Sequence, residues 1–202
     1  MKYIEFIGLP GAGKSSFYYK EIKRLNGYER NEALSLKNKG ILFYIKCIPV
    51  FSILILFFLP TKVFTSKNKF KAILRYLIFI KLLSLLIISS KPIAVDQGVV
   101  QAYWSYIIEL NSHPKHQTKT LGSILNKFFD TELVYINTSL KLNIHKFIER
   151  KNSTLKTTQF DDLPPNELRK KFSNGNRLFF EILDSMSHLE KLTITKVFHR
   201  YE

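Results

Sequence analysis

A short glycine-rich segment near the start of the sequence constrains the fold more than any other feature. Residues 8–15 read GLPGAGKS, a full match to the pattern G-x-x-x-x-G-K-[ST]. An apolar, β-prone run at residues 3–7 leads directly into the glycines, and a helical pattern at residues 16–25 follows them. A strand, a glycine loop and a helix start in this order direct backbone N–H groups and a helix N-terminus at one anion. The sequence therefore predicts a phosphate-binding loop.

The residue types within this loop match distinct roles toward a nucleoside triphosphate. Glycines allow the backbone to turn tightly and to approach phosphate oxygens without a Cβ in the way. Lys14 would place a mobile positive charge beside the β- and γ-phosphates. The Ser15 hydroxyl would serve Mg²⁺, which prefers oxygen ligands. The candidate nucleotide-binding residues are Gly8, Pro10, Gly11, Ala12, Gly13, Lys14, Ser15 and Ser16.

Length and composition set broad limits on the class of protein. A chain of 202 residues fits one domain, 1–202, with room for a core. The net charge of +15 favours anionic partners, but it does not distinguish nucleotides, nucleic acid and an anionic membrane surface. A nucleic-acid partner is supported by the net charge alone, so we do not favour it. The single cysteine, Cys47, excludes a disulfide framework within the monomer. Because the first apolar run is short, we expect no signal peptide and a cytoplasmic location.

Two apolar segments, residues 41–59 and 72–90, predict a helical hairpin inserted into this domain. Each is close to the length of about 20 residues that a bilayer span requires. Arg75 and Lys81 oppose a spanning role, because a charge near the centre of a span costs about 2.5–3.5 kcal/mol. The favoured interpretation is a hairpin at 41–90 that packs as part of the domain.

A membrane-surface role for the same hairpin stays open beside this interpretation, with true spanning as a third alternative. At about 100° per residue, Lys67, Lys71, Arg75 and Lys81 share one side of the second helix. A basic stripe on an apolar helix suits contact with an anionic membrane, and it equally suits contact with solvent or with a phosphate-bearing substrate.

A second segment that could carry a catalytic or binding residue is residues 91–98, KPIAVDQG. A short apolar strand ends there in Asp96, and the tip of a parallel strand lies at the ligand-binding edge of an α/β sheet. Beside a phosphate-binding loop, Asp96 could join Ser15 in holding Mg²⁺, or accept a proton from a phosphoryl acceptor. Asp96 is therefore a candidate both for catalysis and for metal binding.

The remaining segments complete an α/β pattern. Helices are predicted at 99–111, 121–129, 140–150 (capped by Ser139) and 166–186. Strands are predicted at 132–137 and 191–198. Loops are predicted at 111–120 and at 151–165, and the second of these loops is lid-like. The predicted fold is a P-loop NTPase three-layer α/β/α arrangement. Its parallel sheet has four or five strands, and the apolar helical hairpin is an insertion.

Residues 1–27 and 91–198 together resemble the P-loop nucleoside and nucleotide kinases. Residues 133–172, LVYINTSLKLNIHKFIERKNSTLKTTQFDDLPPNELRKKF, are similar to the strand, helix, lid and following helix of divergent thymidylate-kinase-like proteins. The resemblance implies that Lys146 and Arg150 contact phosphates at the junction of helix and lid, and that Asp96 is the family's acid after a strand. Gln97 departs from the arginine that usually follows this acid.

Two hypotheses about function result. The first is an ATP-dependent, Mg²⁺-requiring phosphotransferase in which Lys14, Asp96 and Arg150 are catalytic and Lys146 helps to bind the nucleotide. Its small-molecule acceptor could be a nucleoside monophosphate, a nucleoside, a sugar or a lipid-linked hydroxyl. The second is a membrane-peripheral nucleotide-binding switch or scaffold that acts through residues 41–90 without kinase activity. ATP is favoured over GTP because the sequence contains no N-K-x-D motif.

Overall fold

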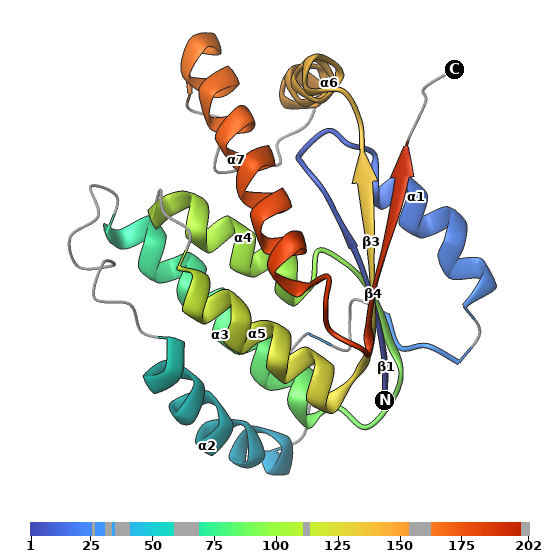
Figure 1. Cartoon of the computed structure of the whole chain (residues 1–202), viewed down its shortest axis with the longest axis vertical. Helices are drawn as coiled ribbons and strands as arrows, with labels where there is room; N and C mark the ends of the chain where they lie inside the picture. Colours follow the sequence, from blue (N-terminus) through green and yellow to red (C-terminus); the bar gives the residue numbers. More distant parts are fainter. Residues whose placement is uncertain are drawn as a thin grey trace.

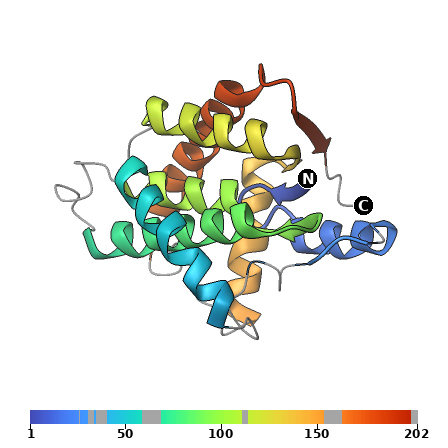
Figure 2. The ribbon, with the colours of Figure 1, turned by 90° about the horizontal axis from the view of Figure 1, so that it is seen from below.

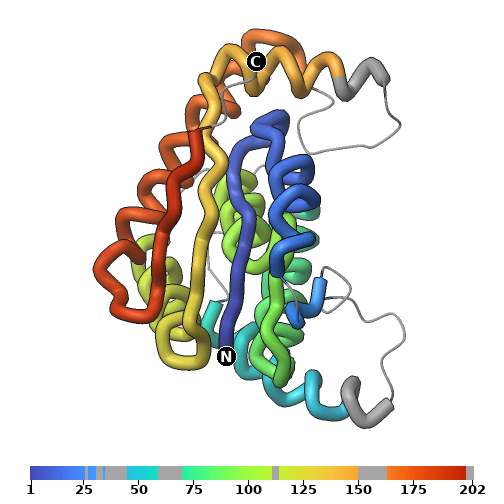
Figure 3. The backbone as a smooth tube through the Cα atoms, turned by 90° about the vertical axis from the view of Figure 1, so that its right-hand side faces the viewer, coloured from blue at the N-terminus to red at the C-terminus, as the bar shows by residue number. Residues whose placement is uncertain are grey.

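A parallel β-sheet with helices on both faces forms the body of the protein (Figures 1 and 3). The computed structural model describes residues 1–25, 27–30, 34, 41–58, 69–110, 114–153 and 163–198. The sheet has four strands in the order β2-β1-β3-β4, and every pair is parallel. The strands are β1 (Lys2–Ile7), β2 (Ile93–Asp96), β3 (Asp130–Asn137) and β4 (Leu192–Phe198). The predicted α/β class is confirmed, and the parallel sheet, predicted with four or five strands, has four in the described part of the chain.

In the described chain, two or more helices separate each strand from the next. They are α1 (Lys14–Glu21), the 3₁₀ helix η1 (Ile22–Arg24), α2 (Ile41–Phe58), α3 (Lys69–Ile88), α4 (Val99–Leu110), α5 (Lys115–Phe128), α6 (Leu140–Ser153) and α7 (Pro165–Met186). In Figure 2, α1 lies on one side of the sheet, whereas α3, α4, α5 and α7 lie on the other.

The alternation of side chains along β1 explains why both faces are covered. Ile4 and Phe6 belong to the smaller apolar core beneath α1 and η1. Tyr3 and Ile7 belong to the larger core formed with the helices of the opposite face. Because a central parallel strand is buried on both faces, it reads as a nearly continuous apolar run. Glu5 interrupts this run on the face of the larger core and is completely buried.

The apolar segments form the hairpin that was predicted, with α3 packed along α4 and α2 outside α3 (Figure 1). Tyr76 on α3 donates its hydroxyl to the carbonyl of Ile55 on α2 at 2.7 Å, which fixes the two helices against each other. Of the helices that the structure describes, none is both long and apolar enough to cross a membrane. The connector between them, residues 59–68, lies outside the described residues.

Several segment boundaries differ from the sequence-based expectation, including those at the start of α5 and at the predicted lid. Residues 115–120, predicted as a loop, form the first turns of α5, because their polar side chains are satisfied within the fold. Gln117 donates to the carbonyl of Phe58 at 2.9 Å, and the hydroxyl of Thr118 pairs with that of Tyr103 at 2.9 Å. At the predicted lid, α6 extends through Ser153 and α7 begins at Pro165. Residues 154–162 lie outside the described residues, so the lid remains a prediction.

Candidate functional site

The glycine loop connects β1 to α1 at the carboxyl edge of the sheet. Gly11 has a φ of 83°, in the left-handed region that favours glycine. A Cβ on Gly11 would also collide with the carbonyl oxygen of Asn143, and it would lie 3.2 Å from the amide nitrogen of Phe147. Both groups belong to α6. The tip of the loop therefore touches the backbone of α6, and glycine is required for this close approach.

Lys14 is the first residue of α1, and its side chain folds back over the loop. The ammonium donates to the carbonyl oxygens of Gly8 and Leu9, each at 2.9 Å. Although it carries a charge, the residue is only 7 % exposed. The charge of Lys14 therefore lies within the curve of the loop, at the amino end of α1, where an anion is favoured.

Ser15 and Asp96 meet beside this loop although 81 positions separate them in the sequence. The strand β2 lies next to β1 with Asp96 opposite Phe6, which brings the aspartate to the level at which β1 passes into the loop. The Ser15 hydroxyl donates to Oδ2 of Asp96 at 2.5 Å. Burial raises the pKa of the Asp96 carboxyl, whereas the Ser15 hydrogen bond and the positive charge of Lys14 act in the opposite direction.

The hydroxyl and carboxylate pair suits a hard cation such as Mg²⁺, which takes oxygen ligands. The two oxygens are already neighbours beside the loop, since the Ser15 hydroxyl is hydrogen-bonded to Asp96. In the described part of the chain, no group of three or more His, Cys, Asp or Glu side chains could hold a metal by itself. A cation at Ser15 and Asp96 would therefore depend on ligands from the nucleotide and from water.

A buried network beneath Asp96 was not foreseen from the sequence. The Glu5 carboxylate accepts hydrogen bonds from the Tyr3 hydroxyl at 2.7 Å and from the backbone N–H groups of Val100 and Gln101 at 2.9 and 2.8 Å. It thus caps the first turn of α4. Burial raises the pKa of Glu5 to about 7, although these hydrogen bonds act to lower it.

The same network reaches the glycine loop. The side-chain oxygen of Gln101 accepts a hydrogen bond from the Gly8 N–H at 3.1 Å. Gly98 makes this approach possible, since a Cβ there would collide with the Tyr3 hydroxyl and lie 2.6 Å from a methyl of Val95. The signal in the sequence was a lone glutamate inside an apolar strand together with a glycine two residues after Asp96.

The helix α6 carries the other two residues that the family resemblance singles out. The Ser139 hydroxyl accepts a hydrogen bond from the Leu142 N–H at 3.3 Å, which confirms the predicted cap of this helix. Lys146 forms an ion pair with Glu149 at 3.1 Å, and its side chain is 42 % exposed. Arg150 lies on the same helix, but its side chain is outside the described part of the structure. The packing of α6 against the loop places the backbone of both residues at the same edge as Lys14.

Comparisons with known proteins give a likeness of fold. No protein-family model matches the sequence. No curated protein matches it either. The fold is similar to two solved structures of deoxyadenosine kinase from M. mycoides. The structure with dCMP and dCDP bound shares 16% identity at a TM-score of 0.49, over 96% of this chain and 88% of that chain. The structure with dATP bound shares 15% identity at a TM-score of 0.45, over 96% of this chain and 90% of that chain. Because both scores are below 0.5, we infer the roles of residues from the geometry of this chain.

Proposed function

We propose that the protein is an ATP-dependent phosphotransferase, similar to nucleoside and nucleotide kinases, that phosphorylates a small molecule. The observation that supports this most directly is the pairing of Ser15 with Asp96 beside the loop that holds Lys14. A loop alone accounts for phosphate binding. An additional half-buried carboxylate at the same point is suited to hold a metal or to take up a proton during transfer.

In the proposed reaction, a hydroxyl or phosphate oxygen of the acceptor forms a bond to the γ-phosphorus while the bond between this phosphorus and the leaving oxygen of ADP breaks. Lys14 and the loop N–H groups stabilise charge on the phosphate oxygens. Asp96 accepts the proton of an acceptor hydroxyl, a role that a raised pKa favours. Ser15 and Asp96 would hold Mg²⁺ together with the nucleotide, and the ion would supply neutralising charge.

The helix α6 is proposed to act on the opposite side of the phosphates. Its backbone contacts the tip of the loop at Gly11. Lys146 would exchange its partner Glu149 for a phosphate oxygen, and Arg150, one turn further along, would act on the phosphoryl group in transfer. Residues 151–165 would then exclude water, which otherwise competes with the acceptor.

The test is ADP release measured across panels of nucleosides, nucleoside monophosphates and sugars. We expect at least one acceptor to stimulate ADP release, and Lys14→Ala to abolish it. Lys20→Ala is the matched control, because Lys20 is exposed on the same helix and should leave activity unchanged. If ATP binds to the wild type but no acceptor in the panels stimulates turnover, the phosphotransferase proposal fails and the nucleotide-binding switch takes its place.

A further inference from the structure

The outward side of α2 is apolar, which is unusual for a helix at the surface of a domain. Leu54 and Phe58 are buried against α3 and the core. Leu56 is 78 % exposed and lies on the other side of the helix. Together with it, the apolar side chains of Ile45, Ile48, Ile53 and Phe57 are more than half exposed.

The helix α3 extends this apolar surface. Phe70, Leu74 and Leu77 are exposed, and Phe70 is 79 % exposed. Their spacing of four and three residues places them on one stripe of the helix, and a further four residues lead to the exposed Lys81. The stripe therefore runs beside α2 and ends in a positive charge.

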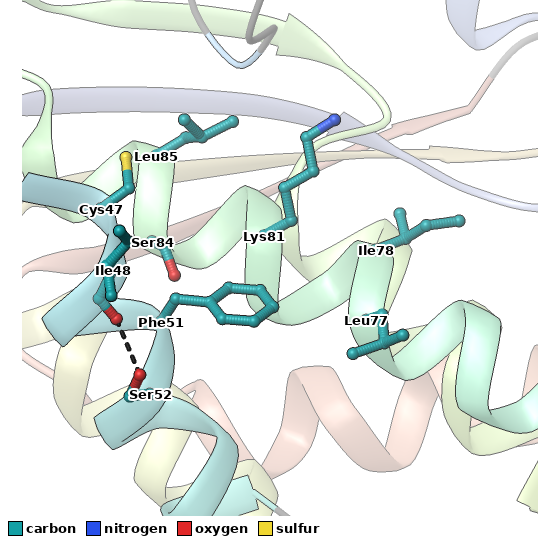
Figure 4. A pocket seen from close by; sticks show the side chains of 9 residues that line it. All are labelled: Cys47, Ile48, Phe51, Ser52, Leu77, Ile78, Lys81, Ser84 and Leu85. Carbon is teal, nitrogen blue, oxygen red and sulfur yellow. Dashed lines mark hydrogen bonds between the residues drawn. The ribbon is translucent and has the colours of Figure 1, made fainter. Parts of the chain in front are cut away.

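A groove between the two helices joins these surfaces (Figure 4). It has a volume of about 480 Å³, and the side chains of Ile48, Phe51 and Leu77 contribute to its lining. The hydroxyls of two serines in the groove are bound to their own helices, Ser52 to the Ile48 carbonyl at 2.9 Å and Ser84 to the Ile80 carbonyl at 2.8 Å. The groove thus offers apolar surface, and among the described residues that line it Lys81 is the only charged one.

The charge of the hairpin identifies the kind of partner. Residues 41–90 contain lysines and one arginine but no aspartate or glutamate. Lys46, Lys71 and Lys81 are exposed, and the first and last lie near the same end of the hairpin, since Cys47 and Lys81 border one groove. A partner must combine apolar chains with negative charge, which is the chemistry of an anionic lipid bilayer.

A second copy of the chain fits this surface less well. A symmetric dimer places one patch against the same patch of the other subunit. The lysines of the hairpin would then face lysines, because the hairpin has no acidic residue to pair with them. We propose that the α2–α3 face binds the surface of an anionic bilayer, with its exposed apolar side chains among the acyl chains and its lysines at the headgroups.

This proposal goes beyond phosphotransfer and does not depend on it. In Figure 1, α2 lies at the lower left, whereas α6 and the carboxyl edge of the sheet lie at the top. A bilayer against α2 would therefore leave the edge that carries Lys14 and Asp96 uncovered.

The test is flotation of the full chain with phosphatidylglycerol or phosphatidylcholine vesicles at physiological salt. We expect at least about tenfold stronger binding to phosphatidylglycerol, and a loss of about tenfold or more in the double variant Leu56→Asp/Phe70→Asp. Replacing Lys46 and Lys81 by serine should weaken binding by about fivefold for each lysine. Phe128→Asp is the matched control, because Phe128 is half exposed on α5, and it should bind within about twofold of the wild type.

Circular dichroism of each variant establishes that the fold is retained, so that a loss of binding reports on the surface. Equal binding to both kinds of vesicle would overturn the role of the lysines. Unchanged binding of the double aspartate variant would overturn the apolar contact and leave only attraction by net charge. The proposal also fails if the chain does not bind either kind of vesicle. In that case, a dimer seen in light scattering that Leu56→Asp/Phe70→Asp converts to a monomer would show that a second copy of the chain covers this face.

Discussion

The buried carboxyl of Glu5 makes stability depend on pH in a direction opposite to that of most carboxylates. Burial raises the pKa of Glu5 from its ordinary 4.5 to about 7 in the folded protein. Between these values, the folded chain keeps a proton that the unfolded chain releases. The contribution of protonated Glu5 to the free energy of unfolding is therefore fully present below about pH 4.5, and it is lost as the pH rises through about 7.

The size of this effect follows from the two pKa values. At about 1.4 kcal/mol per pH unit, a pKa that moves from 4.5 to about 7 corresponds to about 3 kcal/mol. Glu5→Gln places a neutral amide in the same position. The amide has one acceptor oxygen in place of two, so either the Val100 or the Gln101 N–H loses its acceptor, which lowers stability by an amount that does not depend on the ionisation of residue 5.

The assay is urea unfolding at a series of pH values, followed by the fluorescence of Trp104, which is buried and is the only tryptophan of the chain. As the pH rises from about 4.5 to 7.5, we expect the wild type to lose about 3 kcal/mol relative to Glu5→Gln. Glu167→Gln is the control, because it changes an exposed glutamate, and its plot of unfolding free energy against pH should be parallel to that of the wild type. If the Glu5→Gln and wild-type curves are also parallel, Glu5 is ionised in the folded protein throughout, and the reasoning from burial is wrong.

Three further substitutions address the contacts around the loop. Gly98→Ala should lower the free energy of unfolding by about 1–3 kcal/mol in urea melts, because its Cβ would collide with the Tyr3 hydroxyl. Gly11→Ala should weaken ATP binding in calorimetry by about tenfold, because the left-handed backbone is strained and the new methyl would press against the Asn143 carbonyl of α6. Asp96→Asn should reduce the gain in ATP affinity that Mg²⁺ provides by about tenfold, while metal-free binding changes little; an undiminished Mg²⁺ effect in calorimetry would exclude Asp96 from the metal site.

The glycine loop was predictable because its information is local. The residues that determine the strand, the turn and the first helical turn are contiguous, and each has its own conformational requirement. The same holds for α2 and α3, whose apolar runs predicted the hairpin. The order β2-β1-β3-β4 is different, because strand neighbours depend on how distant segments pack. The sequence suggested that Asp96 lies at the ligand edge, but it did not specify β1 as its neighbour.

Glu5 shows why part of the candidate site could not be predicted. A glutamate in an apolar strand indicates a buried polar contact, yet its partners Val100 and Gln101 are more than 90 positions away. The start of α5 was missed for a related reason. Gln117 and Thr118 read as surface residues, whereas both are buried because Phe58 and Tyr103 supply hydrogen-bonding partners. Sequence patterns register the polarity of a side chain but not the distant group that satisfies it.

The buried network under the loop holds Asp96 in a fixed position. A carboxylate at the end of a strand is followed by a turn, and here Gln97 adopts a φ of 67°, which is uncommon for a side chain other than glycine. Such a turn holds its shape only if the chain after it is anchored. Glu5 provides that anchor, because it binds the N–H groups of the first turn of α4. Gln101 then ties the same turn to Gly8, so Asp96 and the loop are held by one strand, β1, and one helix start. Changes at Glu5 should therefore act on nucleotide binding through the position of Asp96, although Glu5 itself is sealed from solvent.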